Sequence, residues 1–481
     1  MDATLSARSL ENLLGDWRGD GGSAYRALAD RIRLLVLDGR IPVDTRLPAE
    51  RDLAERLALS RTTVTAAYRE LRDQRLLHSV RGSGSVARLP GAPAILPAPP
   101  TADYIDFSKA APPGLPWLAD VARAAADDLP GELGGAGFDL VGTPALRAAI
   151  ADRYTARGLP THPEQIMVTI GAQHAIALLS RALIGRGDRA LIEAPTYPHA
   201  YEALRAAGAR LVTVPVEPRD GGADGFGAVD EVEALTRAIR HSNPVAAYLM
   251  PDFQNPTGRS LSADARERVL DAAARQGTVV IADETTAELD IDRGLDLAPL
   301  AAYGPAVMIG SVGKTVWGGI RVGWIRAERP LLRRLLAVRS PNDLGTPIME
   351  QLMVTRLLDR MDDILELRRE QLRAGRDRLE SLLAGAFPDW HVPHVDGGIV
   401  TWVGLGAPVS SQLALAARSQ GLIIAAGPRF GIDGAFERFL RLPICYSAET
   451  TDAAVQALSR AWGALARTPV PADQGVLGAV V

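Results

Sequence analysis

A proline-rich segment divides this chain of 481 residues into two unequal parts. Residues 89–101 contain five prolines, and proline is poorly tolerated inside helices and central strands. We therefore expect an extended linker over residues 89–103, between a small N-terminal part and a much larger one. The last residues, 468–481, are again rich in glycine and proline, and a loosely ordered tail is expected there.

The overall composition is that of an ordinary globular protein, with 47% hydrophobic and 23% charged residues and a formal net charge of −4. The charge is unevenly distributed, because residues 24–88 hold 13 arginines against 8 acidic residues. This excess predicts a small module with an anionic partner, although a solvated basic face would give the same imbalance.

The chain shows no sign of export or of a membrane anchor. Its single cysteine, Cys445, excludes an internal disulfide and is typical of a reducing compartment. The first residues lack the basic and apolar stretches of a secretory signal, and no apolar run reaches the length of about 18 residues that a membrane span needs. We therefore expect a cytoplasmic protein without a membrane partner.

The N-terminal part shows helical spacing of apolar residues followed by two short strand-like runs. The expected elements are helices over 24–38, over 49–57 and from Ser60 onward, and strands over 76–80 and 85–87 around a glycine-containing turn at 81–84. Together they predict a winged helix-turn-helix over residues 24–88, preceded by an N-terminal extension, 1–23.

The third expected helix begins with Ser60-Arg-Thr-Thr63, whose hydroxyls and guanidinium can reach phosphates and base edges in a major groove. This stretch and Leu47-Pro-Ala-Glu-Arg51 resemble the GntR-type DNA-binding domain, and the resemblance implies double-stranded operator DNA as a partner. It places DNA contacts at Arg51, Ser60, Arg61, Thr62, Thr63, Gly82 and Gly84. The alternative is a three-helix interaction module in which the Ser/Thr run only caps a helix.

Lysine is almost absent, since only two of the 53 lysine and arginine residues are lysines. Lys109 lies in a loop-like segment, whereas Lys314 stands within Gly310-Ser-Val-Gly-Lys-Thr-Val-Trp-Gly-Gly-Ile-Arg321. A chain that otherwise uses arginine needs lysine where a free amine must attack an aldehyde, because arginine stays protonated. Lys314 is therefore the candidate for a Schiff base.

Helical and strand-like segments alternate over residues 104–467, which predicts an α/β domain around a largely parallel sheet. Within it, Ile170-Gly-Ala-Gln173 follows a strand-like run and opens a helix, so that its backbone N–H groups suit a phosphate. Ser311 and Arg321 flank Lys314 and can contact the same phosphate.

Three further side chains can contact the ring of a cofactor. Tyr197 offers an aromatic face, and Asn255 offers an amide to a ring oxygen. Asp283 follows the apolar run 278–282 and can hold a pyridinium N–H, which keeps the ring an electron sink. Each residue alone has an ordinary explanation, such as packing or a turn, but their order along the chain favours a cofactor site.

Residues from about 104 to 467 resemble the class I aminotransferases, fold type I enzymes that depend on pyridoxal 5′-phosphate (PLP). The resemblance implies that Lys314 forms the Schiff base, that Asp283 binds the pyridine nitrogen, and that Asn255 and Tyr197 contact the ring. It assigns the phosphate to Ala172, Gln173, Ser311 and Arg321, and a substrate or effector carboxylate to Arg441. For Arg441 the alternative is a pairing with a structural acid. No metal site is predicted.

One position departs from the family pattern. The family usually has a tyrosine two or three residues after the aspartate, where it donates a hydrogen bond to the cofactor's ring oxygen. This chain has Thr285 and Thr286 there, and their shorter side chains should not reach in the same way. We therefore expect PLP to bind with little or no productive turnover.

A winged helix, a proline-rich linker and an aminotransferase-like domain together resemble the MocR subfamily of GntR regulators. The resemblance implies a homodimeric regulator that senses PLP, a small amino compound, or both, through an aldimine at Lys314. A catalytically active aminotransferase with a DNA-binding head is the alternative. A sensor of PLP that needs no amino ligand is a third possibility.

Overall fold

The computed structural model describes residues 4–15, 17, 23–37, 41, 45–74, 76–80, 84–87, 104–216, 231–294, 297–432 and 435–466. The chain forms two compact units. Unit 1 combines Met1–Phe107, Leu405–Leu440 and Ala453–Val481, and unit 2 combines Ser108–Gly404 and Arg441–Asp452. The expected linker and tail, and the turn residue Gly82, lie outside the described residues.

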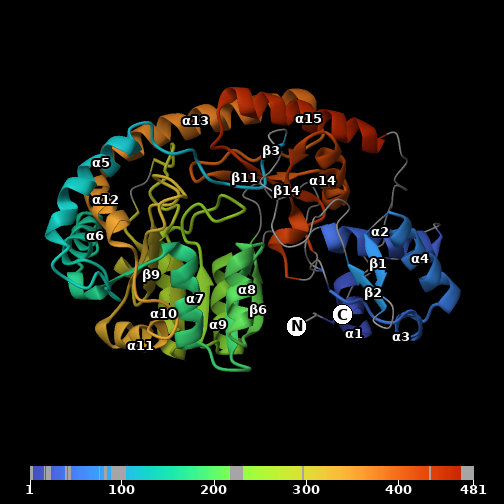
Figure 1. Ribbon diagram of the computed structural model, residues 1–481, viewed down its shortest axis with the longest axis horizontal. Coiled ribbons are helices and arrows are strands. Elements are labelled where there is room, and N and C mark those ends of the chain that lie inside the picture. The colour runs from blue at the N-terminus through green and yellow to red at the C-terminus, as the bar shows by residue number, and fades with distance from the viewer. Residues whose placement is uncertain are drawn as a thin grey trace. The chain divides into compact units, whose positions relative to one another are not determined.

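The N-terminal part of unit 1 is a winged helix-turn-helix, which we call the head (Figure 1). Its elements are α1 (Ala7–Leu14), α2 (Ala24–Leu37), α3 (Glu50–Arg56), α4 (Arg61–Asp73), β1 (Leu77–Val80) and β2 (Gly84–Ala87). The helices bury one apolar core, in which Leu28, Leu53 and Leu71 are fully buried. The antiparallel strands pair from Leu77 opposite Ala87 to Val80 opposite Gly84, and they form the wing.

The head also contains a helix that the sequence did not predict. Within the N-terminal extension, α1 is capped by Ser6, and its Leu10 and Leu14 are fully buried in the core of the head. Two leucines at i and i+4 in a helix of 8 residues make too short a pattern to recognise by periodicity. The expected second helix begins at Glu50 rather than directly after Pro48, because Ala49 adopts the extended N-cap conformation.

The C-terminal part of unit 1 is small. It contains α14 (Ser410–Ser419), β12 (Leu422–Ile423), β13 (Ala425–Ala426) and the 3-10 helix η4 (Gly427–Phe430). β12 pairs in parallel with β3 (Ile105–Asp106). Glu437 accepts hydrogen bonds from Ser410 and Ser411, and its carboxylate lies 3.3 Å from Arg31 of α2. Two elements, β14 (Phe439–Pro443) and α15 (Ala448–Ala466), begin in one unit and end in the other.

Unit 2 is built on a mixed sheet of seven strands in the order β4-β10-β9-β8-β7-β5-β6. The strands are β4 (Ile166–Thr169), β5 (Arg189–Ala194), β6 (Arg210–Pro215), β7 (Ala246–Leu249), β8 (Val279–Asp283), β9 (Val307–Ser311) and β10 (Gly323–Arg326). Only β10 runs antiparallel to its neighbours, β4 and β9. Strands such as β7 are apolar throughout because both faces of the sheet are covered. The predicted α/β domain with a largely parallel sheet is confirmed.

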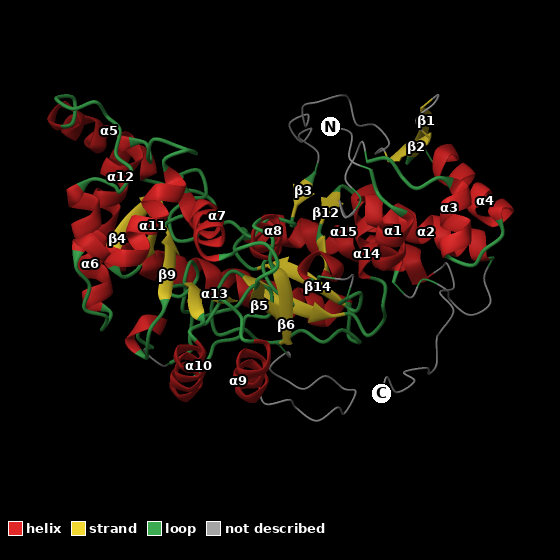
Figure 2. Ribbon diagram, turned by 90° about the horizontal axis from the view of Figure 1, so that it is seen from below, coloured by secondary structure: helices red, strands yellow, loops and turns green. Residues whose placement is uncertain are grey.

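Helices cover both faces of this sheet (Figure 2). The helices of unit 2 are α5 (Leu118–Asp128), α6 (Pro144–Ala156), α7 (Gly171–Leu183), α8 (Pro198–Ala206), α9 (Glu231–Ser242), α10 (Ala263–Gln276), α11 (Arg329–Arg339), α12 (Ile348–Leu358) and α13 (Met361–Ala386). Buried residues of α6, α9 and α10 share one apolar core with the strands, whereas α7 and α8 lie on the opposite face. Among the described helices, none is long and apolar enough to cross a membrane.

The carboxyl ends of six strands meet at one edge of the sheet. β10 is antiparallel to both β4 and β9, so β4 points in the same direction as the parallel strands β5 to β9. The segments that follow these strands therefore reach the same edge. In α/β proteins ligands bind at this edge, and we call it the carboxyl edge below.

Candidate functional site

Most of the predicted cofactor residues lie at or just beyond the carboxyl edge. They are Ala172 and Gln173 after β4, Tyr197 after β5, Asn255 after β7, Asp283 at the end of β8, Ser311 at the end of β9, and Lys314 three residues further on. They follow five different strands of the sheet, and the parallel direction of these strands brings them to the same edge.

The amine of Lys314 is buried and hydrogen-bonded. Its Nζ donates to the carbonyl oxygen of Ala110 at 2.5 Å. Burial, followed by the positive charge of Arg441, lowers the pKa of Lys314 to about 8. An amine with such a pKa is partly unprotonated at neutral pH, as attack on an aldehyde requires. The second lysine, Lys109, has an exposed side chain, although it directly precedes Ala110 in the chain.

The carboxylate of Asp283 is only 2% exposed and accepts three hydrogen bonds. Tyr248 of β7 donates its hydroxyl to Oδ2 at 2.6 Å. Thr285 donates to Oδ1 twice, from its N–H at 3.0 Å and from its hydroxyl at 2.7 Å. Burial and the charge of Asp283 raise the pKa of Tyr248 well above its usual value, so this hydroxyl stays protonated. Oδ2 keeps a lone pair for a further donor such as a pyridinium N–H.

The start of α7 offers a cradle for an anion. The backbone N–H groups of its first turn, residues 171–173, have no acceptors inside the helix. Gly171 has a φ of +78°, and a Cβ there would lie 2.5 Å from Nη2 of Arg321. Arg321 also donates to the carbonyl oxygens of Gly318 and Ile170, at 3.1 and 3.4 Å. Glycine at position 171 therefore lets a guanidinium lie directly against the helix start.

Two other elements support the cradle. The hydroxyl of Ser311 donates to the carbonyl oxygen of Val322 at 3.0 Å and accepts from the N–H of Gly313 at 3.1 Å, which holds the turn that leads to Lys314. A Cβ at Gly323 would lie 2.8 Å from the backbone nitrogen of Ala172, so β10 packs against the start of α7 without a side chain between them.

Several buried polar atoms near this edge have no hydrogen-bond partner among the described residues. They include Asn255 Oδ1, Gln173 Oε1 and Thr196 Oγ1. An unsatisfied buried polar atom costs about 1–3 kcal/mol, so their gathering indicates a polar ligand. The residues fit PLP, because an anion cradle, a buried carboxylate and an amine of lowered pKa occur on the same edge.

Tyr197 and Arg441 border the same region. Burial raises the pKa of Tyr197 to about 12, with the charge of Asp283 as the next cause, and the positive charges of Arg441 and Arg321 oppose the shift. Arg441, on β14, is 7% exposed and donates to the carbonyl oxygen of Ser108. An arginine so placed can bind a carboxylate that enters beside Lys314.

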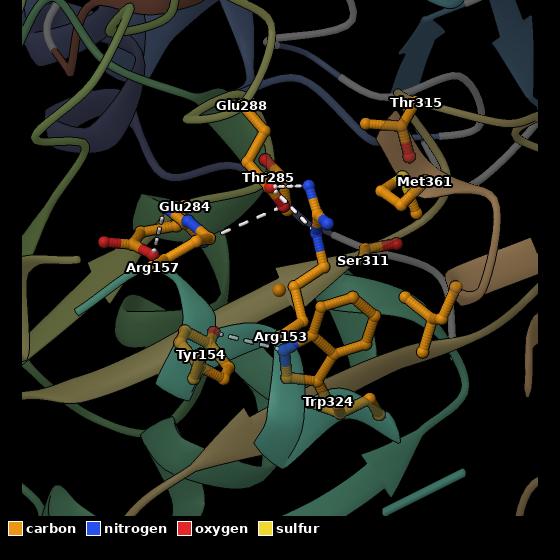
Figure 3. Close-up of a pocket in the computed structure, with 13 residues that line it drawn as sticks. Arg153, Tyr154, Arg157, Glu284, Thr285, Glu288, Ser311, Thr315, Trp324 and Met361 are labelled. Atoms are coloured by element: carbon orange, nitrogen blue, oxygen red, sulfur yellow. Dashed lines mark hydrogen bonds and ion pairs between the residues drawn. The ribbon is translucent and has the colours of Figure 1, made fainter. Parts of the chain in front are cut away.

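A recess of about 490 Å³, counting the solvent at its mouth, adjoins this edge (Figure 3). Thr285 and Ser311 line it together with two charged pairs that sequence reasoning missed. Arg153 donates to Glu288, and Nη2 of Arg157 lies 3.5 Å from Oε2 of Glu284. Burial raises the pKa of Glu284 to about 7, and Arg157 opposes this shift. These residues come from α6 and from the turn after β8, so only the fold brings them together.

The predicted DNA-binding residues lie on α3, at the start of α4 and on the wing. Arg51, Ser60, Arg61 and Thr62 are exposed, Thr63 is half-buried, and Gly84 begins β2 with a φ of +87°. Ser60 Oγ accepts the N–H of Thr63 at 3.1 Å, so this serine caps α4. The hydroxyl of Thr65, one helical turn further, donates to Glu50 at 2.7 Å and therefore stabilises the head internally.

One group away from the cofactor residues has the chemistry of a metal site. The ligand atoms of Asp292, His394 and Asp396 lie within 4.8 Å of one another. However, Asp292 is paired with Arg376 at 2.9 Å and His394 with Glu380 at 3.0 Å. Asp292 and His394 are therefore each already in contact with another side chain.

Comparison with known proteins supports two families. Residues 102–458 match the aminotransferases of class I and II, and residues 24–86 match the gntR family of bacterial regulatory proteins. The uncharacterized HTH-type transcriptional regulator YisV of Bacillus subtilis is 25% identical over 466 residues, covering 88% of this chain and 92% of YisV. The probable rhizopine catabolism regulatory protein MocR of Rhizobium meliloti is 32% identical over 337 residues, covering 63% of this chain and 64% of MocR.

A solved structure shares the fold of the large part. LysN, an alpha-aminoadipate aminotransferase from Thermus thermophilus complexed with N-(5′-phosphopyridoxyl)-L-leucine, has a TM-score of 0.68 and 27% identity. The match covers 76% of this chain and 94% of LysN, and its phosphopyridoxyl ligand agrees with the PLP that this fold implies. The chain therefore belongs to the class I and II aminotransferase family and carries a GntR-type helix-turn-helix head, the domain combination of the MocR subfamily.

Proposed function

We propose that this protein is a transcriptional regulator that binds operator DNA through its head and binds PLP in its aminotransferase-like domain. PLP, a small amino compound, or both act as the effector. One observation carries the proposal: a GntR-type head is joined to a carboxyl edge that has the lysine, the aspartate and the anion cradle needed for PLP.

The residues of the carboxyl edge would divide the task of holding PLP. The first turn of α7, Ser311 and Arg321 would bind the phosphate, and Asp283 would accept the pyridine N–H. Asn255 would contact the ring hydroxyl, and Tyr197 would cover one ring face. The bound cofactor supplies an electron-withdrawing ring and an aldehyde that a primary amine can attack.

An amino compound would act at the same place. Its primary amine would lie beside Lys314, and its carboxylate would bind Arg441. An added amine beside Lys314 and a carboxylate at Arg441 would change the charge around β14. Such a ligand alters DNA affinity only by the difference between its affinities for the DNA-bound and the DNA-free arrangements.

Exposed apolar side chains support a homodimer. Leu133 and Phe138 are 70% exposed and Leu344 is 57% exposed. Asp139 pairs with Gly345 in an isolated parallel bridge, which places Phe138 and Leu344 next to each other. Neighbouring exposed apolar residues of this size are typical of protein interfaces. A second copy of this chain would cover them, and two heads would then match the two half-sites of an operator.

The proposal is tested with a DNA duplex that the full-length protein selects from a random-sequence pool. Fluorescence anisotropy would compare the affinity of the apo and PLP-loaded protein for this duplex, with and without a panel of amino acids. We expect a change of at least about fivefold on adding PLP or PLP with an amine. Lys314→Ala should bind the duplex and lose the response, and Lys109→Ala should keep it. Failure to select any duplex would exclude DNA binding, and equal affinities throughout would exclude the effector role.

A working aminotransferase is the competing function, and Thr285 and Thr286 weigh against it. With neither threonine able to donate like the usual tyrosine, we expect amines to change the cofactor's absorbance without accumulation of a keto product. Steady-state assays with the amino-acid panel and 2-oxoglutarate separate the two functions. Sustained turnover of roughly 1 per second or faster would make this protein an aminotransferase first.

A further inference from the structure

We infer that Tyr248 and Thr285 are positioning residues for PLP: together they hold the Asp283 carboxylate so that one lone pair of Oδ2 faces the cofactor's ring nitrogen. The inference deepens the proposed function and rests on it. Neither residue belongs to the set that the aminotransferase resemblance assigns to the cofactor.

The hydrogen bonds leave the Asp283 carboxylate little freedom. Two oxygens offer about four lone-pair sites, and three of them are filled by donors at 2.6 to 3.0 Å. Both donors to Oδ1 come from Thr285, so rotation of the carboxylate would break two bonds at once. The remaining site is on Oδ2, which also accepts from Tyr248. A ring N–H must therefore approach that oxygen.

The position of Tyr248 in the sheet explains how it reaches Asp283. Tyr248 pairs with Ile281 of the adjacent strand, two residues before Asp283. Residues i and i+2 of a strand share one face, so Ile281 and Asp283 point to the same side of β8. The Tyr248 side chain is 1% exposed, and its hydroxyl bond to Asp283 is closed to solvent.

Thr285 supports the carboxylate from the turn after β8. Its hydroxyl is committed to Asp283, and the residue lines the recess shown in Figure 3. The N–H of Glu284 donates to the carbonyl oxygen of Ile309 at 2.9 Å, which holds the turn against β9. The side chain that stands two residues after the aspartate thus acts on the aspartate. It does not extend toward a cofactor ring oxygen as a tyrosine would.

Removal of single hydroxyl groups tests this role. Tyr248→Phe and Thr285→Val keep the shape of the side chain and remove the donor. Each should weaken the binding of PLP to the full-length protein roughly tenfold or more, as expected for a lost hydrogen bond to a charged group. Each should also shift the absorbance band of the bound cofactor. Thr285→Ser, which keeps the hydroxyl, should bind PLP like the wild type.

A PLP analogue with carbon in place of the ring nitrogen (1-deaza-PLP) separates positioning from packing. It has no N–H for Asp283, so Tyr248→Phe and Thr285→Val should bind it as tightly as the wild type does. Tyr154→Phe and Thr286→Val are matched controls, because these buried hydroxyls bond to Trp324 and to the carbonyl oxygens of Asp252 and Phe253. Both controls should bind PLP normally.

The outcomes are distinct. The positioning role would be overturned if the variants lose as much affinity for the analogue as for PLP. It would also be overturned if neither variant loses affinity for PLP or shifts the absorbance band. If the wild type binds neither compound, the proposed PLP site itself is wrong. Thermal unfolding of apo Tyr248→Phe and apo Thr285→Val shows whether each variant is folded. If one of them is not, the PLP affinity of the other tests the positioning role.

Discussion

At the scale of single residues, burial favours the neutral form of several ionisable side chains of unit 2, among them Lys314, Glu193 and Glu284. It lowers the pKa of Lys314 to about 8, and it raises the pKa values of Glu193 and Glu284 to about 8 and about 7. Of the three, only Lys314 is an amine, and only Lys314 lies where a ligand aldehyde would need one. The two acids affect stability instead.

The lowered pKa of Lys314 predicts how PLP capture depends on pH. The unprotonated amine attacks the aldehyde, so the rate of capture by the apo protein should rise with pH and level off above about 8. Stopped-flow absorbance measures this rate. Arg441→Gln should move the midpoint to higher pH, because it removes a positive charge that disfavours the ammonium form. Lys109→Ala should follow the wild-type curve, and a wild-type midpoint near 10.5, the ordinary lysine value, would contradict the prediction.

Glu193 predicts a pH-dependent stability. Its side chain is 1% exposed, its Oε2 accepts the N–H of Met250 at 2.9 Å, and burial raises its pKa from 4.5 to about 8. The folded state therefore keeps a proton that the unfolded state releases, and this contribution to stability is complete below about pH 4.5 and is lost as pH rises toward about 8.

Glu193→Gln removes this titration and keeps an acceptor for Met250. The free energy of unfolding of the wild type, relative to that of the variant, should fall by up to about 4 kcal/mol across this range. Denaturant unfolding at several pH values measures the difference. A difference that does not change with pH would show that Glu193 titrates normally in the folded protein.

At the scale of elements, the ends of two helices carry the proposed function. The first turn of α7 lies at the carboxyl edge, where we propose that the cofactor's phosphate binds, and the first turn of α4 presents Arg61 and Thr62 to solvent. In both cases the ligand would meet unsatisfied N–H groups and a neighbouring arginine at a helix N-terminus.

Gly171→Ala tests the α7 end. The added methyl group would meet Arg321 and would also strain a residue with a φ of +78°. We expect PLP affinity to fall roughly tenfold, about 1.4 kcal/mol, as measured by equilibrium dialysis. Gly187→Ala is the control, since Gly187 has a φ of +89° and no atom within 4 Å of an added Cβ. If both variants bind PLP equally well, Gly171 has no special part in the cradle.

Arg61→Ala tests the α4 end. It removes a base or phosphate contact and should weaken binding to the selected duplex by about 1–3 kcal/mol, while PLP binding stays unchanged. Arg26→Ala, an exposed arginine on α2, is the matched control and should have a smaller effect. Wild-type DNA affinity in Arg61→Ala would mean that the start of α4 does not enter the groove.

At the scale of the whole molecule, the two ligands should respond differently to salt. The chain has a net charge of −4, yet residues 24–88 carry a net positive charge. DNA affinity should therefore fall steeply with salt, through release of counterions from the phosphates. The proposed PLP site is buried, so the affinity for PLP should change little over the same range. Parallel titrations at several salt concentrations measure both, and a salt-independent DNA affinity would contradict the proposed groove contacts.

The sequence by itself determined the class of each part, because the signals are local. A helix cap with its neighbouring arginine, a glycine before a helix and a lysine in an arginine-rich chain are each read from a few consecutive residues. The order of these signals along the chain matched known families, and the fold of both parts was predicted from that resemblance. Helix α1 was not predicted from the sequence, because two leucines are too few to indicate a helix.

Tertiary structure alone decided which groups act on one another. Tyr248 and Asp283 are 35 residues apart, and only the pairing of β7 with β8 brings the hydroxyl to the carboxylate. The charged recess likewise joins Arg157, the residue that follows α6, to Glu284 after β8. Local sequence can specify a turn or a cap, but the burial that shifts the pKa of Lys314 and the contacts that orient Asp283 depend on residues distant in the chain.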